Sequence, residues 1–161
     1  MISTLDQLVA LRESARPVTV GTINGAFDVI HSGHIEIFTE CRLHCGFLIA
    51  LVNSDASVRR YKGPDRPFYR EIERAEVIGA LRAVDAVGIF DEDDPSLALN
   101  VIVPDVHFLG LEYADLSGKE YALRPVPERA VVEALGGRIV FLGGKKREGT
   151  SGLIERIRAT L

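Results

Sequence analysis

Two histidines stand three residues apart in a glycine-bearing segment, residues 25–34, that reads Gly-Ala-Phe-Asp-Val-Ile-His-Ser-Gly-His. On a helix, this spacing places the imidazoles of His31 and His34 on one face. Neutral imidazoles can donate hydrogen bonds to phosphate oxygens, and the free N–H groups of a helix start favour the same anions. Gly25 lets the chain approach an anion closely, and Gly33 leaves room for a ligand. The segment predicts a phosphate site, with simple capping and packing of a helix start as the alternative.

A metal site is a second interpretation of the same region. Two cysteines and a third histidine follow closely, namely Cys41, His44 and Cys45. Zinc takes nitrogen and sulfur ligands, and His34, Cys41 and Cys45 fall near one helical face. The spacing differs from that of a zinc ribbon or finger, and one straight helix cannot close four ligands around a metal. We therefore expect no protein-bound metal and treat both cysteines as small buried hydrophobic residues.

The pattern Gly-x-Phe-Asp-x-x-His-x-Gly-His resembles the signature of the cytidylyltransferase-like nucleotidyltransferases. It differs from the three-glycine dinucleotide fingerprint and lacks the ending of a P-loop. The resemblance implies that His31 and His34 are catalytic and contact the α-phosphoryl and leaving oxygens of a nucleoside triphosphate. It also assigns to the nucleotide site Gly25, Ala26 and Phe27. We expect Asp28 to brace the loop by hydrogen bonds rather than to hold a metal.

A second segment, residues 52–63, is similar to the heptose-phosphate nucleotidyltransferases of bacteria, and the similarity continues through Arg66-Pro67 and Glu73-Arg74. In that family the lysine before the glycine contacts both the triphosphate and the acceptor phosphate. Lys62 matches this lysine, and a solvated loop lysine is the alternative. The arginine of the next helix matches Arg74, which the resemblance assigns to the nucleotide site.

Basic residues followed by Glu-Gly-Thr-Ser lead into the last expected helix. This run looks like the last motif of the family, which implies that the β- and γ-phosphates bind to Arg147, Thr150 and Ser151. Hydroxyls and free N–H groups at a helix start suit such anions, although Thr150 and Ser151 are equally good plain N-caps. The Arg-x-Gly ending is similar to that of the CTP-dependent glycerol-phosphate cytidylyltransferases.

The end of the fourth expected strand departs from the heptose pattern. Residues 109–113 read Leu-Gly-Leu-Glu-Tyr, where heptose-phosphate adenylyltransferases typically show Lys-Gly-Gly-Asp-Tyr. The resemblance places Glu112 at the acceptor together with Lys62. If Leu109 and Leu111 line the acceptor pocket, they remove hydrogen-bond partners for sugar hydroxyls, which favours a smaller phosphate or phosphonate. A core position for Leu109 is the alternative.

Short apolar runs alternate with longer amphipathic stretches. The expected strands are residues 17–23, 47–52, 86–90, 106–109 and 138–142. The expected helices are one capped by Ser3 or Thr4 and stopped by Pro17, then 32–44, 71–84, 95–102, 128–135 and 150–160. This alternation predicts a parallel sheet whose ligands bind beyond the carboxyl ends of the strands. The expected fold class is α/β: a Rossmann-like, five-stranded parallel sheet with helices on both faces. One domain covers 1–161, with an N-terminal helix in 1–16 and the core in 17–161.

Charge and composition limit the partners. The chain has 161 residues, with 19 Lys+Arg against 23 Asp+Glu, so its net charge of −4 provides no broad field for nucleic acid or an anionic membrane. Two cysteines favour a reducing cytoplasm over a secreted disulfide scaffold. The longest apolar run, residues 47–52, is too short to span a bilayer. We expect a cytoplasmic enzyme with small-molecule partners, and the resemblance adds a possible homodimer.

The reaction implied by the resemblance is attack of an acceptor phosphate or phosphonate oxygen on the α-phosphorus of a nucleoside triphosphate, with release of pyrophosphate. Mg²⁺ is implied as cofactor, because it neutralises the triphosphate and needs few protein ligands. The departure at residues 109–112 narrowly favours CTP and a small acceptor. The alternative is ATP-dependent adenylyl transfer to heptose 1-phosphate or a similar sugar phosphate. A regulatory nucleotide-binding module without catalysis is a different class, against which both histidines and Lys62 argue.

Overall fold

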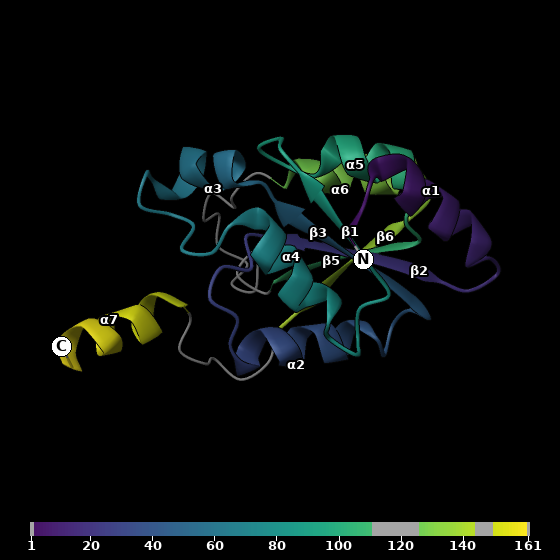
Figure 1. The fold of residues 1–161 in the computed structure, drawn as a ribbon. Helices are drawn as coiled ribbons and strands as arrows, with labels where there is room; N and C mark the ends of the chain where they lie inside the picture. The colour runs from purple at the N-terminus through teal and green to yellow at the C-terminus, as the bar shows by residue number, and fades with distance from the viewer. Residues whose placement is uncertain (1, 111–125, 144–149, 161) are drawn as a thin grey trace, which may run out of the picture.

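The computed structural model of the chain describes residues 2–110, 126–143 and 150–160 (Figure 1). In this part of the chain, six strands form one parallel sheet in the order β1-β4-β3-β2-β5-β6. The strands are β1 (Ile2–Ser3), β2 (Val20–Gly25), β3 (Phe47–Asn53), β4 (Ala86–Phe90), β5 (Val106–Gly110) and β6 (Arg138–Leu142). The helices are α1 (Leu5–Ser14), α2 (Ser32–Cys41), α3 (Asp55–Lys62), α4 (Glu71–Gly79), α5 (Ser96–Ile102), α6 (Pro127–Ala134) and α7 (Thr150–Thr160).

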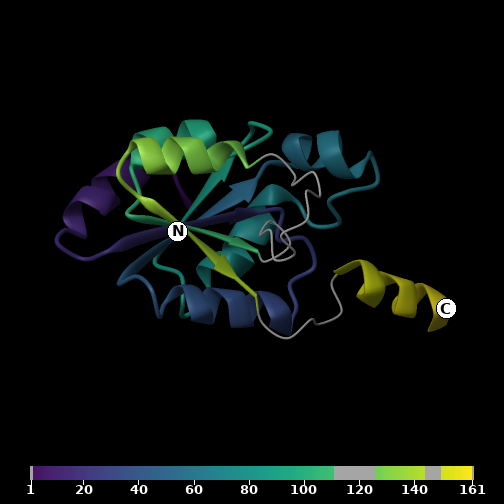
Figure 2. The same cartoon turned by 180° about the vertical axis from the view of Figure 1, so that it is seen from behind.

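Helices cover both faces of the sheet, as the uninterrupted apolar sequence of β3 predicts. Leu48 and Ala50 of β3 pack on one face with Phe38 of α2 and Ile78 of α4. Ile49 and Leu51 of β3 face the opposite side with apolar residues of α1, α5 and α6. Figures 1 and 2 show α2 and α4 below the sheet and α1, α5 and α6 above it. None of the described helices is long and apolar enough to cross a membrane.

The order of the strands creates a switch point beside β2. The chain leaves β2 for β3 and β4 on one side, then crosses to β5 and β6 on the other side of β2. Crevices at the carboxyl ends of strands, where the strand order reverses, are the places where open α/β sheets bind ligands. The loop that follows Gly25 leaves the sheet at this point, and it is the segment that carries both histidines.

All five expected strands are present, and the sixth strand, β1, corrects the prediction. Ile2 and Ser3 pair in parallel with Val87 and Gly88 at the edge of the sheet. Two residues are too few to show the alternation of a strand, so the sequence signal was that of α1 alone. The N-terminal segment therefore extends the sheet and also adds a helix. Thr4 caps this helix: its hydroxyl accepts a hydrogen bond from the Gln7 backbone N–H, and its own backbone N–H donates to the Gln7 side chain.

Helix α3 was not expected, and its polarity explains why. Only Ser57 and Val58 of its eight residues are buried, so no apolar stripe identifies it. Its start is fixed instead by Ser54, whose hydroxyl accepts a hydrogen bond from the Ser57 backbone N–H at 2.9 Å. Other bounds shift by a few residues: α2 ends at Cys41, α4 ends at Gly79, and the first predicted strand begins at Val20.

Candidate active site

The two signature glycines make room for the side chains of the site itself. A Cβ added at Gly25 would lie 3.1 Å from two atoms of the Phe27 ring. A Cβ added at Gly33 would lie 2.9 Å from Cε1 of His31. The glycines expected to admit a ligand therefore admit the ring of Phe27 and the imidazole of His31. The loop is also strained, because Phe27 and Val29 have φ values of 48° and 57°, which L side chains rarely adopt. Such strain concentrates at functional sites.

His31 and His34 lie together at the start of α2, with ring centroids 4.0 Å apart. His31 is the N-cap, and its Nδ1 accepts a hydrogen bond from the Gly33 N–H at 3.1 Å. Nδ1 of His34 accepts from the His31 N–H at 3.3 Å. Since an accepting nitrogen carries no proton, each neutral ring carries its proton on Nε2. Capping thus sets the tautomer, so the capping and phosphate-binding interpretations are compatible: each ring keeps an Nε2–H donor for a ligand.

The electrostatic environment keeps His34 neutral. Burial, followed by repulsion from His31 and from the ammonium of Lys62, lowers the pKa of His34 to about 4. The ring also packs edge-to-face against Phe27, with centroids 6.0 Å apart. A neutral donor in a partly dry setting is strengthened when negative charge develops on the atom that it contacts.

We expect His34 to titrate near pH 4 instead of near its ordinary value of 6.5. Between these values the unfolded chain binds a proton that the folded chain excludes. Stability should therefore fall as the pH drops from about 6.5, until the loss is complete below about 4. NMR titration of the imidazoles measures this pKa. A His34 pKa at or above 6.5 would contradict the described environment.

Asp28 braces the signature loop against a second loop, as expected from the sequence. Its side chain is fully buried, and Nε and Nη2 of Arg66 both lie 2.7 Å from its Oδ2. Its Oδ1 accepts from the backbone N–H groups of Phe68 and Tyr69 at 2.9 and 3.3 Å. One buried carboxylate thereby ties the histidine loop to the segment that follows Lys62. The brace was identified from the signature, but its partner Arg66 was not predicted as a site residue.

Lys62 lies in the last turn of α3, close to this brace. Partial loss of water around its ammonium, followed by repulsion from Arg66, lowers its pKa, while Asp28 acts in the opposite direction. Its charge in turn contributes to the low pKa of His34. The structure therefore brings Lys62 to the same end of the sheet as the histidine pair, as the sequence interpretation requires. The residue is exposed at the surface, where an anion can reach it.

Arg74, predicted at the nucleotide site, is an internal brace in the structure. It is only 1% exposed, and its guanidinium donates to the Ala26 and Tyr69 carbonyl oxygens and, at 2.8 Å, to Oδ1 of Asp55. Ala26 belongs to the signature loop, so Arg74 holds that loop against the start of α3. Three of its donors are used inside the protein, and direct contact with the nucleotide stays a prediction.

Leu109 is a core residue of β5, with 5% of its surface exposed. The alternative interpretation of this position is thus the correct one, and Leu109 does not replace a polar wall of an acceptor pocket. Leu111, Glu112 and Arg147 lie outside the described residues. Thr150 and Ser151 open α7 at the predicted residue, and their phosphate contacts stay predictions.

The described residues contain no group of three or more His, Cys, Asp or Glu side chains that could hold a metal ion. Cys41 and Cys45 are both buried in the core, as expected for small apolar residues. Burial raises the pKa of the Cys41 thiol, which disfavours the thiolate that zinc requires. The zinc interpretation therefore gains no support in this part of the chain.

One buried polar pair was missed. His107 of β5 is fully buried, and its Nδ1 lies 2.8 Å from Oγ1 of Thr22 on the neighbouring strand. Burial lowers the pKa of His107 to about 3, so this imidazole is also neutral. Among the described residues, its Nε2 has no hydrogen-bond partner. A single histidine in an otherwise apolar strand carries no spacing signal from which such a pair can be predicted.

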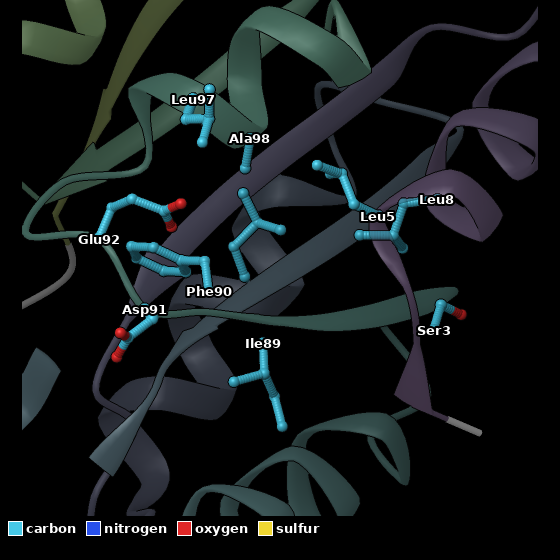
Figure 3. A pocket seen from close by; sticks show the side chains of 10 residues that line it. Ser3, Leu5, Leu8, Ile89, Phe90, Asp91, Glu92, Leu97 and Ala98 are labelled. Atoms are coloured by element: carbon cyan, nitrogen blue, oxygen red, sulfur yellow. The ribbon is translucent and has the colours of Figure 1, made fainter. Parts of the chain in front are cut away.

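A cavity of about 160 Å³ lies away from this site, between α1, β4 and α5 (Figure 3). Its walls are mostly apolar, with Leu5, Leu8 and Phe90 among them, and the carboxylates of Asp91 and Glu92 stand at its side. None of its lining residues is basic, so it does not suit a phosphate. The candidate active site is therefore the histidine loop and the braced segment around Lys62.

The structure is a doubly wound parallel sheet with two imidazoles at its switch point and a lysine at the same end of the sheet, which defines an α/β protein of the open-sheet class. The comparison with known proteins makes this specific. The family model described as cytidylyltransferase-like matches residues 22–135, and the chain belongs to this family. It is an enzyme of the nucleotidyltransferase class.

Curated relatives support the same family. The chain is 38% identical over 142 residues to the bifunctional protein HldE of Mesorhizobium japonicum, covering 88% of this chain and 27% of the relative. It is 40% identical over 153 residues to HldE of Nitrobacter winogradskyi, covering 94% of this chain and 29% of the relative. The chain therefore spans less than a third of the length of these relatives.

Solved structures share the fold. A lipopolysaccharide core biosynthesis protein from Thermoplasma volcanium is similar with a TM-score of 0.61 and 24% identity, covering 81% of this chain and 99% of that one. A pantoate-beta-alanine ligase from Francisella tularensis is similar with a TM-score of 0.57 and 14% identity, covering 91% of this chain and 68% of that one. At these identities the likeness concerns the fold alone.

Proposed function

We propose that this chain transfers the adenylyl group of ATP to a sugar 1-phosphate of the heptose 1-phosphate kind and releases pyrophosphate. The observation that carries the proposal is the His31–His34 pair at the switch point, in which each Nδ1 accepts a backbone hydrogen bond, together with Lys62 at the same end of the sheet. The pair supplies two donors without a permanent charge, and Lys62 supplies the charge. Together they suit a reaction in which two anions must approach each other.

We propose ATP and a sugar phosphate as the substrates, in place of the CTP and small acceptor that the sequence narrowly favours. That preference depended on the departure at residues 109–112, of which Leu109 is buried in the sheet while Leu111 and Glu112 lie outside the described residues. The relatives are HldE proteins, and residues 52–74 resemble heptose-phosphate enzymes. These observations favour the ATP-dependent alternative.

In the proposed step, an oxygen of the acceptor phosphate forms a bond to the α-phosphorus of ATP. The bond from the α-phosphorus to the bridging oxygen breaks, and pyrophosphate leaves with that electron pair. The acceptor is already an anion, so no protein nucleophile is needed. The Nε2–H groups of His31 and His34 donate to the α-phosphoryl and leaving oxygens, where negative charge grows in the transition state. Lys62 contacts the acceptor phosphate and the triphosphate.

Mg²⁺ belongs to this proposal as the counter-ion of the triphosphate. It keeps several waters and needs one or two protein oxygens at most. The absence of a three-ligand cluster among the described residues is compatible with a metal that arrives on the nucleotide. The chemistry it would supply is neutralisation of charge on the β- and γ-phosphates.

Pyrophosphate release tests the proposal directly. ATP and CTP are each paired with heptose 1-phosphate and with glycerol 1-phosphate, and kcat/KM is measured for the four combinations. The proposal predicts the highest value for ATP with the sugar phosphate. A tenfold or greater preference for CTP with glycerol 1-phosphate, on the order of 1.4 kcal/mol, would restore the first preference and overturn this one.

Lys62→Ala is expected to raise the KM of both substrates, because one ammonium serves two anions. The fold should not change, since Lys62 is exposed at the end of α3. Steady-state kinetics with each substrate varied in turn measure the effect, and thermal unfolding controls for the fold. Arg59→Ala, which removes an exposed cation from the same helix, is the matched control and should leave both constants unchanged. Early melting of Lys62→Ala with normal kinetics would show a structural lysine.

A further inference from the structure

A second cavity, of about 240 Å³, lies between the loop after Lys62 and helix α7. Six residues line it: Asp65, Arg66, Phe68, Ile154, Glu155 and Arg158. Its volume is below the roughly 300–1,000 Å³ of sites for drug-sized ligands. It therefore suits one sugar ring better than a whole nucleotide.

One wall of this cavity is held rigidly by the signature loop. Two nitrogens of Arg66 lie 2.7 Å from Oδ2 of buried Asp28, and its guanidinium carbon lies 4.6 Å from the centre of the Phe68 ring. The Phe68 N–H also donates to Asp28. Despite this fixation, 50% of the Phe68 surface is exposed. A large apolar side chain that is fixed and yet open to water offers a ready surface for a ligand.

The opposite wall comes from α7, which adds the half-buried Ile154 and the exposed Glu155 and Arg158. The cavity thus combines an aromatic ring with two carboxylates and two guanidiniums. Carboxylates accept hydrogen bonds from hydroxyls, guanidiniums donate to them, and aromatic rings cover apolar C–H faces. A sugar presents both kinds of surface, whereas for a phosphate the two carboxylates would offset the attraction of the two guanidiniums.

The cavity is also next to the anion site. The Arg66 N–H donates to the Gly63 carbonyl oxygen at 3.2 Å, which closes a turn directly after Lys62. A phosphate bound to Lys62 would therefore lie within a few residues of the aromatic wall. We propose that this cavity binds the sugar ring of the acceptor, with Phe68 as its stacking surface, while Lys62 holds the phosphate. This inference rests on the function proposed above and deepens it.

The test compares Phe68→Ala with Ile72→Ala, which truncates a side chain of nearly equal exposure, 49%, that does not line the cavity. Phe68→Ala should raise the KM for the sugar 1-phosphate about tenfold, while kcat and the KM for ATP stay within about twofold. Ile72→Ala should change none of these constants. Phe68→Tyr should restore the KM, and Arg158→Ala should raise it from the other wall. With glycerol 1-phosphate as acceptor, Phe68→Ala should have no effect on KM.

The outcomes separate the two proposals. An unchanged sugar KM in both Phe68→Ala and Arg158→Ala, with an active wild-type enzyme, would overturn the sugar site and leave the proposed function standing. A wild-type enzyme that releases no pyrophosphate with any sugar 1-phosphate would overturn the proposed function, and the sugar site with it. Thermal unfolding of each variant shows whether a loss of activity comes from a loss of the fold. If Phe68→Ala does not fold, the KM values of Phe68→Tyr and Arg158→Ala for the sugar 1-phosphate decide whether the cavity binds the sugar.

Discussion

Replacing His34 by alanine is expected to lower kcat by about 10²–10³, the usual cost of removing one donor to a developing oxyanion. The Kd of the triphosphate should change far less, because the Nε2–H contact strengthens only as charge grows on the leaving oxygen. The fold should survive, since His34 is partly exposed and contributes one acceptor to the His31 N–H. Single-turnover kinetics and nucleotide titration measure the two quantities separately.

His44→Ala is the matched control for this variant, because His44 is exposed and lies after the other end of α2. Its kcat should equal that of the wild type. A second comparison is His34→Gln, whose amide nitrogen can take the place of Nε2 and should recover part of the lost rate. The role assigned to His34 would be refuted if His34→Ala kept more than about half of the wild-type activity, which is far above the activity expected to remain.

Replacing Arg74 by methionine is expected to cost about 3 kcal/mol of unfolding free energy. Breaking a buried ion pair by removing one partner typically costs about 3–5 kcal/mol. The low end applies because the Asp55 side chain is 20% exposed and water can replace part of the lost contact. The Ala26 and Tyr69 carbonyl oxygens lose donors at the same time. Urea denaturation measures the change, with the exposed Arg82→Met as control.

A second substitution at this position, Arg74→Lys, distinguishes a structural brace from a residue that binds the nucleotide. If Arg74 is a brace, Arg74→Lys should also be less stable than the wild type. A single ammonium cannot replace the planar guanidinium, which contacts two carbonyl oxygens and a carboxylate at once. ATP affinity should then recover at lower temperature, where the variant is folded. Full stability together with lost ATP affinity would show instead that Arg74 contacts the nucleotide, as the family resemblance implies.

Periodicity predicts the sheet well where the apolar signal is strong. The bounds of β4, β6 and α7 agree with the sequence prediction, and the alternation of apolar runs indicates the parallel sheet. The failures are β1 and α3, for different reasons. The first is too short to alternate, and the second has too few buried residues to show a helical stripe. Both are held by contacts with distant residues, such as the pairing of Ile2 with Val87.

The candidate site is predictable where its parts are adjacent in the sequence. The spacing of His31 and His34 is sufficient to place both rings at one helix start, and the Asp28 brace follows from the same motif. The identity of its partner is not local, because Arg66 lies 38 residues away. Likewise, the sequence cannot show that Gly33 makes room for His31, or that Leu109 is in the core. Those facts depend on how the strands and loops pack.

The most direct measurement follows the α-phosphorus. The wild-type chain is mixed with ATP labelled at the α-phosphate, Mg²⁺ and heptose 1-phosphate, and the products are separated. The proposed reaction predicts one unlabelled pyrophosphate for every labelled nucleoside diphosphate sugar, with both products lost in His34→Ala and retained in His44→Ala. Formation of labelled ADP and a second phosphate on the sugar would contradict it, because the attack would then fall on the γ-phosphorus.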